Sequence, residues 1–538
     1  MLSEKTLLVQ ERSSHGGVRK LIALALALAL VLTLLVAPVA IQASVPDGVY
    51  SFGNYSYGQL GLGESSAIRA LDNTIPNRIG GMPIAGFPGL ENPKDVAAGD
   101  THSLVLLHNG DVYSFGDTQY GKLGHGEMDD TYLFVPKKIE GIGKAAAIGT
   151  GRDRSFISLE NGDLYAFGRN GASGQLGVGH TELSVRVPTK VEGIRHAVKI
   201  DGGQTHTLVL QENGDVYGFG RGHTTLGQGD RAPGTYLTPV KVPLPGPAID
   251  IAAGWTHSLA VLENGDVYAF GGNYYGALGL GLGFESKVFA TPLRIEGLGP
   301  ANAVAAGNSS SFVLLENGDL YSFGYNDRGQ LGLGDTEHRD VPVKVETISG
   351  VAMVTAGDRH TLAVLENGHV YSWGDSGAKL GHGDTTTQRS TPTLIKGLQG
   401  NNGLALAAGT GQSLVLVGTP PITIEIDGRL LLTDVPPVIL DGRTMVPLRA
   451  IFEALDTEVE YDAGTRTITG TSGDSVIQLT IDSTQATVNG EEVALDVPAT
   501  VMEGRTLVPV RFIAESTGQE VGWEARTRTV LIKTVQTR

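Results

Sequence analysis

Seven short apolar strands of this 538-residue chain end in an aromatic residue followed by glycine, and this repeat constrains the fold more than any other feature. The closing glycines stand 63, 52, 52, 51, 53 and 50 residues apart. Each interval holds four strand segments, which is the content of one blade of a β-propeller. The copies are VYSFG at 49–53, VYSFG at 112–116, LYAFG at 164–168, VYGFG at 216–220, VYAFG at 267–271, LYSFG at 320–324 and VYSWG at 370–374.

An Asn-Gly pair precedes six of the copies, and another apolar strand precedes each pair, as in HSLVLL at 102–107 before Asn109-Gly110. Asn-Gly tolerates the positive φ angles that a two-residue hairpin turn needs. The pattern therefore predicts a β-hairpin with a two-residue turn in each copy.

The two ends of the repeat region each lack a partner strand. No strand precedes Val49–Phe52, and no aromatic-Gly strand follows Ser413–Val417. Pairing these two strands would leave only short protected edges. We therefore predict a mainly β chain: a seven-bladed β-propeller closed by pairing of the repeat region's two ends, followed by a small duplicated α+β domain.

The N-terminus has the three regions of a secretory signal peptide. Arg19-Lys20 precedes an apolar run over 21–37, and small residues follow up to Ser44. We expect cleavage near Ala43. The alternative is a retained membrane anchor, because the apolar run extends over about twenty residues and a bilayer core is about 30 Å thick. The expected parts are thus a signal peptide or uncleaved anchor at 1–43, the propeller at 44–418 and a second domain at 419–538.

The charge and the cysteine content exclude several classes of protein. The net charge is −17 with no basic stripe, which disfavours nucleic-acid binding. The chain has no cysteine, so it has no disulfides, thiolate metal ligands or cysteine nucleophile. An exported chain without disulfides favours a bacterial origin, and we expect a secreted or cell-surface location.

The motifs around the aromatic-Gly strands resemble those of the regulator of chromosome condensation repeat family over 49–417. They include GQLGLGD at 329–335 and VAAGDTHSL at 96–104. The resemblance implies a seven-bladed propeller and no single function. Guanine-nucleotide exchange on a small nuclear GTPase, which the family includes, is disfavoured by the secretory signal. The family also resembles secreted bacterial propellers that inhibit β-lactamase.

No catalytic or metal-binding constellation stands out from the repeat. The glycine-rich motif recurs seven times between strands, whereas a phosphate loop needs one strand-to-helix turn. His102, His206, His257 and His360 share a repeat position with Arg154, Ser310 and Gln412, which a zinc or copper site would not accept. We expect these residues to make hydrogen bonds that lock each blade. Most carboxylates fall in turns, and no Ser-His-Asp spacing is present, so we predict no enzyme activity, no metal and no cofactor.

The loops directly after the aromatic-Gly strands differ among the copies while the frame around them stays fixed. Recognition is usually built on such loops, and tyrosine and arginine are favoured contact residues. The competing interpretation is neutral drift of ordinary loop residues. An insertion within 64–95 is either a binding arm or a longer loop. The candidate binding residues, expected to line one face of the ring, are Tyr55, Tyr57, Tyr120, Arg169, Arg221, His223, Tyr274, Tyr275, Tyr325 and Arg328.

A second duplication, with an offset of 62 residues, follows the propeller. Val446-Pro447 matches Val508-Pro509, and each half predicts a hairpin, a short amphipathic helix and two strands. RTMVPLR and RTLVPVR at 443–449 and 505–511 resemble the copper amine oxidase N-terminal-like domain, a stalk remote from the oxidase chemistry, over 422–533. This part of the chain has no histidine or cysteine, so we predict no copper there. Its arginines, Arg443, Arg449, Arg505 and Arg511, bind either an anionic polymer or, as we expect, neighbouring acids.

The features together predict an exported bacterial binding or scaffold protein that uses loops on one propeller face to bind a protein or a cell-surface ligand. The expected partner is an extracellular protein or a cell-wall polymer, with membrane contact only through an uncleaved N-terminal segment. The alternative is a secreted inhibitor of an extracellular hydrolase. A glycan-active enzyme would need an acid pair that converges on a pocket at one ring face. The sequence leaves the oligomeric state open.

Overall fold

A computed structural model describes residues 47–538, except 64–76, 79–89, 91, 128–129, 223, 231–233, 376, 385–387, 399–401, 419–421, 432, 434, 436, 474, 503, 525–527 and 535–538. The expected signal peptide or anchor at 1–43 and almost all of the insertion within 64–95 therefore lie outside the described residues. In the part that the structure describes, no helix is both long and apolar enough to cross a membrane.

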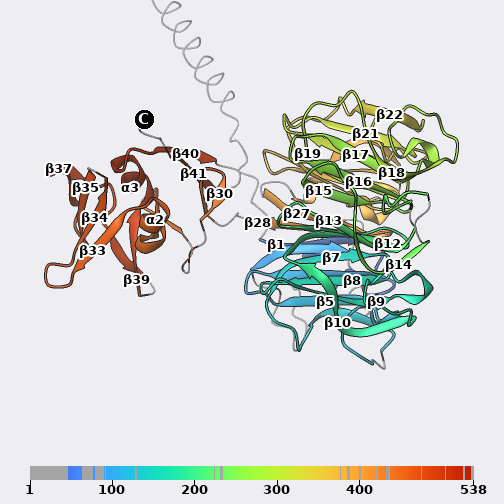
Figure 1. Ribbon diagram of the computed structural model, residues 1–538, viewed down its shortest axis with the longest axis horizontal. Helices are drawn as coiled ribbons and strands as arrows, with labels where there is room; N and C mark the ends of the chain where they lie inside the picture. The colour runs from blue at the N-terminus through green and yellow to red at the C-terminus, as the bar shows by residue number, and fades with distance from the viewer. Residues whose placement is uncertain are drawn as a thin grey trace, which may run out of the picture. The chain divides into compact units, whose positions relative to one another are not determined.

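The repeat region folds into antiparallel sheets of four strands, and the predicted mainly β fold is confirmed (Figure 1). Six sheets are continuous in the sequence. They are β3 (Pro93–Ala98), β4 (His102–Leu107), β5 (Val112–Asp117) and β6 (Tyr132–Lys138); β7 (Ala145–Gly151), β8 (Arg154–Leu159), β9 (Asp163–Arg169) and β10 (Ser184–Arg195); β11 (Ala197–Gly202), β12 (His206–Gln211), β13 (Val216–Arg221) and β14 (Thr235–Lys241); β15 (Ala248–Ala253), β16 (His257–Leu262), β17 (Val267–Gly272) and β18 (Val288–Arg294); β19 (Ala301–Ala306), β20 (Ser310–Leu315), β21 (Leu320–Gly324) and β22 (Arg339–Lys344); and β23 (Val351–Ala356), β24 (His360–Leu365), β25 (Val370–Gly374) and β26 (Arg389–Leu394).

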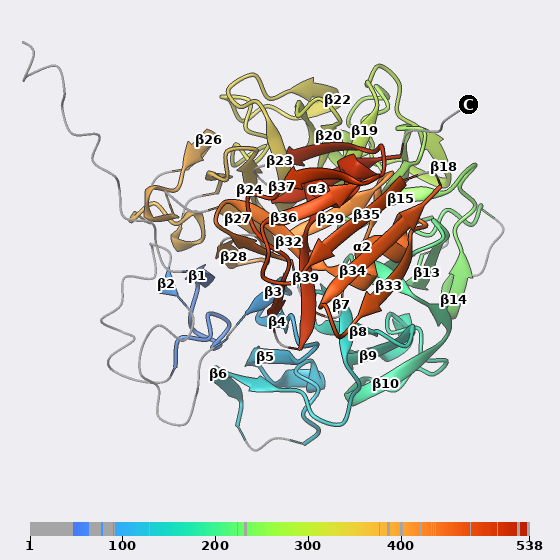
Figure 2. The same ribbon diagram turned by 90° about the vertical axis from the view of Figure 1, so that its left-hand side faces the viewer.

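A seventh four-stranded sheet joins the two ends of the repeat region. Its order is β2 (Asn77–Arg78), β1 (Gly48–Gly53), β28 (Gln412–Gly418) and β27 (Asn402–Ala408). In the β1–β28 pair, Val49 lies opposite Leu416 and Phe52 lies opposite Ser413. The first strands of successive sheets contact one another from β3 through β23, and β27 contacts both β23 and β3. Figure 2 shows the sheets following one another around a common centre in chain order.

The turn between the second and third strands differs from the predicted two-residue hairpin. The backbone N–H of Gly110 donates to the carbonyl of Leu107, and the N–H of Leu107 donates to the carbonyl of Asp111. Gly110 has φ +84°, whereas Asn109 is not in the left-handed region. The turn is therefore a three-residue loop with a glycine bulge. The Asn109 side chain contributes by accepting the N–H of Asp111 at 2.9 Å.

The aromatic-Gly and Leu-Gly motifs meet at the joints between sheets. The aromatic ring of each third strand is fully buried, as at Phe167. Gly124, in the Leu-Gly turn of the preceding sheet, lies against that ring, and a Cβ there would be 2.9 Å from it. Gly381 lies against Phe52 in the same way, which extends the joint from the last sheet to the first. The repeat thus encodes contacts between sheets as well as the sheets themselves.

The C-terminal duplication also forms a packed β-rich unit with two short helices. Its sheets are β30 (Arg429–Leu430), β29 (Thr423–Ile426), β41 (Thr529–Lys533) and β40 (Glu520–Glu524); β31 (Val438–Leu440), β32 (Arg443–Pro447), β39 (Arg505–Pro509) and β38 (Thr500–Met502); and β33 (Glu458–Asp462), β34 (Thr467–Ser472), β35 (Ser475–Thr480), β36 (Gln485–Val488) and β37 (Glu491–Ala494). The helices are α2 (Leu448–Ala454) and α3 (Val510–Ser516).

The two halves of the duplication meet at equivalent residues and exchange strands. Val446 of β32 pairs with Val508 of β39, its equivalent 62 residues on. The first hairpin, β29–β30, joins β41 and β40 of the other half, with β29 and β41 parallel. Neither half therefore completes its own sheet. Arg443 reaches Asp496 at 2.6 Å, and Arg449 and Arg511 lie 3.8 and 3.9 Å from glutamates on their own helices, as expected for pairing with neighbouring acids.

Candidate functional site

The loops after the aromatic-Gly strands emerge on one face of the repeat region. In the register of β4 and β5, His102 lies opposite Gly116, so each third strand ends beside the start of its second strand. The Asn-Gly turns lie at the other ends of the same strands. The face with the loops after the third strands and the turns between the first and second strands is called the loop face below.

The candidate residues differ in their exposure on this face. Tyr55, Tyr57, Tyr274 and Tyr275 are 37–44% exposed, and Arg221 and Arg328 are also exposed. Tyr120, Arg169 and Tyr325 are half-buried. His223 lies outside the described residues.

Two candidate tyrosines from neighbouring sheets form one aromatic cluster. The rings of Tyr275, after β17, and Tyr325, after β21, have centroids 4.6 Å apart. His338, which precedes β22, stacks on Tyr325 at 5.0 Å and meets Tyr275 at 4.9 Å. Phe284 completes the cluster, 6.0 Å from His338. Burial, together with the nearby Asp327 carboxylate, raises the pKa of Tyr325 to about 12, so the phenol keeps its proton.

Sequence reasoning missed His338 and Phe284, because both lie outside the segment directly after an aromatic-Gly strand. Their exposure and their distance from the tyrosines depend on the fold. The only available signal was the unusual Phe284 within a glycine-rich turn, GLGFES at 281–286.

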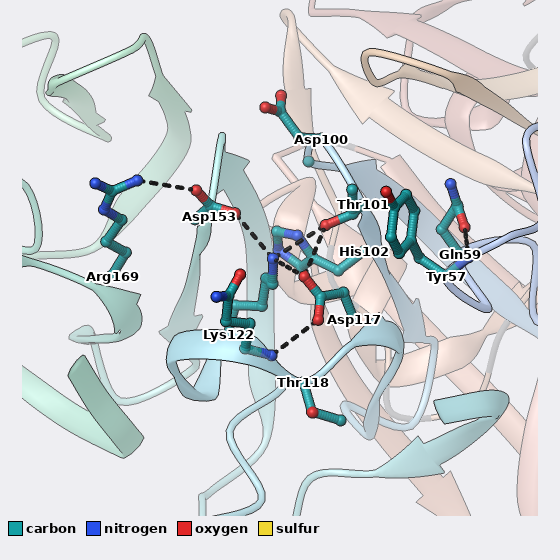
Figure 3. A network of polar contacts seen from close by, with 12 residues as sticks. Tyr57, Gln59, Asp100, Thr101, His102, Asp117, Thr118, Lys122, Asp153 and Arg169 are labelled. Atoms are coloured by element: carbon teal, nitrogen blue, oxygen red, sulfur yellow. Dashed lines mark hydrogen bonds and ion pairs between the residues drawn. The ribbon is translucent and has the colours of Figure 1, made fainter. Parts of the chain in front are cut away.

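Arg169 belongs to a second cluster, a network of ion pairs around Lys122 and Asp153 (Figure 3). The guanidinium of Arg169 lies over the Tyr120 ring at 5.1 Å and 3.6 Å from Asp153 Oδ2. Asp153 Oδ1 accepts a hydrogen bond from Lys122 Nζ at 2.8 Å. Lys122 also contacts Asp117 Oδ2 at 2.7 Å, and its side chain is only 1% exposed.

This network keeps Asp153 ionised. Burial raises the pKa of Asp153, but the charge and hydrogen bond of Lys122 more than offset this and hold the pKa below its ordinary value. The Lys122 ammonium also donates to Thr101 Oγ1 at 3.0 Å. The ion pairs therefore fix the base of the loop that carries Tyr120.

The remaining candidate residues contact other partners. Tyr57 packs edge-on against Tyr132 of β6, with centroids 5.5 Å apart. Arg328 lies 3.8 Å from both Asp327 and Asp375. The structure thus brings four of the candidates together in two pairs at the joints between neighbouring sheets, Tyr275 with Tyr325 and Tyr120 with Arg169.

Tyr120 and Tyr275 share an unusual backbone conformation. Their φ angles are +62° and +57°, in the left-handed region that residues other than glycine rarely occupy. Each is the middle residue of a three-residue 3-10 helix that ends in glycine. These helices are Gln119–Gly121 and Tyr274–Gly276. Strained residues of this kind often mark binding sites. Both candidates therefore have fixed positions on the loop face.

The repeat-position histidines make hydrogen bonds, as the sequence predicts, but these bonds join neighbouring sheets instead of lying within one. His257 Nε2 lies 2.9 Å from Ser311 Oγ of the next sheet, and that hydroxyl donates to the carbonyl of Ala277 at 2.7 Å. The hydroxyl can then only accept from His257, so the ring proton is on Nε2. His102, His206 and His360 contact Ser155, Ser258 and Ser413 in the same manner.

Two of the other residues at this position, Arg154 and Gln412, also bridge sheets. Arg154 Nη2 donates to the carbonyl of Gly203 at 2.8 Å. Gln412 Nε2 donates to the carbonyl of Gly99 at 3.0 Å, across the two ends of the repeat region. Within the described residues, no group of three or more His, Cys, Asp or Glu side chains is placed to hold a metal ion.

A cavity of about 390 Å³ lies among the first strands of the sheets, lined mainly by alanine and valine with Asp95, Lys199 and Asp201. Burial raises the pKa of Asp95 to about 6 and also raises the pKa of Asp201. Asp201 Oδ2 accepts the N–H of Ala253 at 2.9 Å, and Asp95 Oδ1 accepts the N–H of Val96 at 2.8 Å. Backbone groups hold both carboxylates, so each has a structural partner.

Family models match both parts of the chain. Residues 39–299 match the RCC1-like domain, and 317–364 and 367–416 match the regulator of chromosome condensation (RCC1) repeat. Residues 425–532 match the copper amine oxidase N-terminal domain. Both resemblances drawn from the motifs are thereby confirmed.

Similar proteins match a part of the chain. Ultraviolet-B receptor UVR8 of Arabidopsis thaliana is 33% identical over 300 residues, which cover 54% of this chain and 64% of the receptor. Secretion-regulating guanine nucleotide exchange factor of Mus musculus is 29% identical, with 53% of this chain and 61% of that protein covered. The chain thus spans less than two thirds of either relative.

A solved structure shows the same fold. Prp20p from Saccharomyces cerevisiae superposes with a TM-score of 0.61 at 24% identity, covering 69% of this chain and 91% of that one. The chain therefore carries a mainly β region of RCC1-type repeats followed by a copper amine oxidase N-terminal domain.

Proposed function

We propose that this chain is an exported bacterial protein without enzymatic activity, whose repeat region is a closed seven-bladed propeller that binds a protein through its loop face. The observation that carries the proposal is the pairing of candidate residues across sheet joints on that face. Tyr275 with Tyr325, and Tyr120 with Arg169, present aromatic and cationic groups on a frame fixed by inter-sheet hydrogen bonds.

The β1–β28 register and the contact of β27 with β3 support ring closure. The relatives support a binding function by analogy, since a receptor and an exchange factor act through other molecules. The structure with the same fold, Prp20p, is reported together with its binding to Gsp1p and histones. The apolar N-terminal segment supports export, and the C-terminal domain is proposed as a surface- or wall-associated module.

The test is capture by the purified chain from the secreted proteins and, separately, from the wall fraction of the producing cells. The double variant Tyr120→Ala, Tyr275→Ala removes one aromatic group from each cluster. The control is Val198→Ser with Ile249→Ser. These two side chains are 51% and 44% exposed and lie near the starts of β11 and β15, at the ends of the strands away from the loop face.

We expect one protein to be retained by the wild type and the control and lost by the double variant. A one-to-one complex with an extracellular hydrolase would identify the inhibitor alternative. Retention of wall polymer alone, or equal retention by the double variant, would refute protein binding through the loop face.

A further inference from the structure

An exposed apolar patch surrounds the Tyr275–Tyr325 cluster. Phe284 is 50% exposed, Leu282 is 45% exposed and Tyr275 is 44% exposed. Val341 of the neighbouring sheet, also 44% exposed, lies beside this loop, 3.2 Å from where a Cβ on Gly281 would be. We call Tyr275, Leu282, Phe284, Tyr325, His338 and Val341 the blade-joint patch. Contiguous exposed apolar surface of this kind typically marks an interaction site.

Hydrogen bonds between the two sheets hold the blade-joint patch in place. The backbone N–H of Gly283 donates to Asp340 Oδ2 at 3.0 Å, and the N–H of Gly281 donates to the Asp340 carbonyl at 2.8 Å. His338 Nδ1 accepts the N–H of Asn326 at 3.1 Å. The apolar groups are therefore ordered before any partner arrives, which reduces the entropy that binding must overcome.

The charges around the blade-joint patch are predominantly acidic. Segments 273–288 and 325–341 carry five acidic residues, Glu285, Asp327, Asp335, Glu337 and Asp340, against the three bases Lys287, Arg328 and Arg339. Each base already lies within ion-pair distance of an acid, as with Arg339 and Asp335 at 2.6 Å. The Glu337 side chain is 83% exposed. The field over the patch therefore favours a cationic partner.

We propose that the blade-joint patch docks a protein segment in which an aromatic or long aliphatic side chain is flanked by lysine or arginine. This inference rests on the proposed binding function and specifies its partner. Apolar burial against Phe284, Leu282 and Val341 supplies the attraction, and the surrounding carboxylates select the flanking bases. A second copy of this chain is a poorer occupant, because each copy carries a net charge of −17.

The experiment screens a random dodecapeptide library displayed on phage against the purified chain. Phe284→Ser removes the most exposed ring of the patch. Leu183→Ser is the matched control, since Leu183 is an apolar residue, 57% exposed, that directly precedes β10 in another sheet and is not one of the candidate binding residues. Equal urea midpoints for the three proteins verify that both variants are folded.

We expect the wild type and Leu183→Ser to enrich sequences with one large apolar residue and at least two flanking bases, and Phe284→Ser not to enrich them. A labelled consensus peptide should then bind the wild type at least tenfold more tightly than its Lys→Glu or apolar→Ser derivatives. Glu337→Lys should weaken the consensus peptide severalfold at low salt and less at high salt.

Peptides enriched equally on Phe284→Ser would refute docking at this patch while leaving protein binding elsewhere on the loop face intact. An acidic consensus would refute the inferred partner chemistry. No enriched peptide, with a protein still captured from the secreted fraction, would overturn this inference alone. No enrichment and no captured protein would overturn the proposed function as well.

Discussion

The buried histidines at the sheet joints should make the repeat region sensitive to mild acid, and replacing one of them tests the reasoning. Burial lowers the pKa of His257 to about 4, and its Nδ1 is buried without a hydrogen-bond partner. Burial likewise lowers the pKa of His102 and of His206 to about 3 and that of His360 well below its ordinary value. All four rings are at most 1% exposed.

The sign follows from comparing the folded and unfolded chains. An unfolded histidine takes up a proton near pH 6.5, whereas the folded His102, His206 and His257 do not until about pH 4 or below, so stability is present above pH 6.5 and lost as the pH falls. At pH 5 each of these three histidines destabilises the fold by about 2 kcal/mol, and the three together by about 6 kcal/mol. That total is comparable with the whole unfolding free energy of an ordinary domain, about 5–15 kcal/mol.

The variant His257→Gln removes one titrating group and keeps a donor for Ser311. Glutamine is the residue found at the equivalent position 412, where it bridges sheets. The variant should lose about 2 kcal/mol less stability than the wild type between pH 7 and pH 5. The exposed His196 is the control, and His196→Gln should follow the wild type.

The assay is urea unfolding at pH 7.0, 6.0 and 5.0, followed by tryptophan fluorescence, to which the fully buried Trp373 of β25 contributes. Equal pH dependence in the wild type and His257→Gln would refute the argument. So would a wild-type midpoint that stays constant from pH 7 to pH 5.

Three further substitutions test other parts of the structure by urea unfolding. Lys122→Met leaves two carboxylates, 12% and 15% exposed, without their cation and should destabilise the fold by about 3–5 kcal/mol. Lys379→Met, at the same repeat position with one acid partner, should destabilise it by about 1–2 kcal/mol. Equal losses would contradict the assigned network. Gly203→Ala places a Cβ against the Gly254 carbonyl and should lower the unfolding free energy by more than about 3 kcal/mol. Gly246→Ala, whose Cβ has its nearest neighbour at 3.7 Å, should change the unfolding free energy by no more than about 1 kcal/mol. Similar midpoints would show that the close approach is not rigid. Because burial raises the pKa of Asp95 to about 6, its ionisation lowers the stability of the fold as the pH rises from 4 to 6. Asp95→Asn should therefore stabilise the fold by about 1–3 kcal/mol at pH 7 and by less at pH 4. A difference in stability that stays constant with pH would argue against ionisation as the cause.

The local motifs predicted the strands well because their signals act over a few residues. The apolar segments before and after Asn109-Gly110, 102–107 and 112–116, predicted β4 and β5 within one residue of their observed ends. The turn itself was predicted wrongly, since Asn-Gly fits both a two-residue hairpin and a three-residue loop with a glycine bulge. The Asn109 side chain, which accepts the N–H of Asp111, favours the longer loop.

The candidate site was predictable only in part. The frame around each loop follows the repeat, so the sequence could place Tyr275 and Tyr325 on one face. It could not show that their rings are 4.6 Å apart, because that distance depends on how neighbouring sheets pack. Phe284 and His338 join the cluster through the Asp340 hydrogen bonds, which link segments about 57 residues apart.

The sequence by itself determined the repeat and its period, because the aromatic-Gly and Leu-Gly motifs recur along the chain at a nearly constant spacing. Only the tertiary structure decided which exposed side chains share a surface, how buried ammonium and carboxylate groups pair, and how the C-terminal halves exchange hairpins. Those outcomes depend on contacts between residues far apart in the chain. Such contacts are selected by packing and desolvation, which no local pattern records.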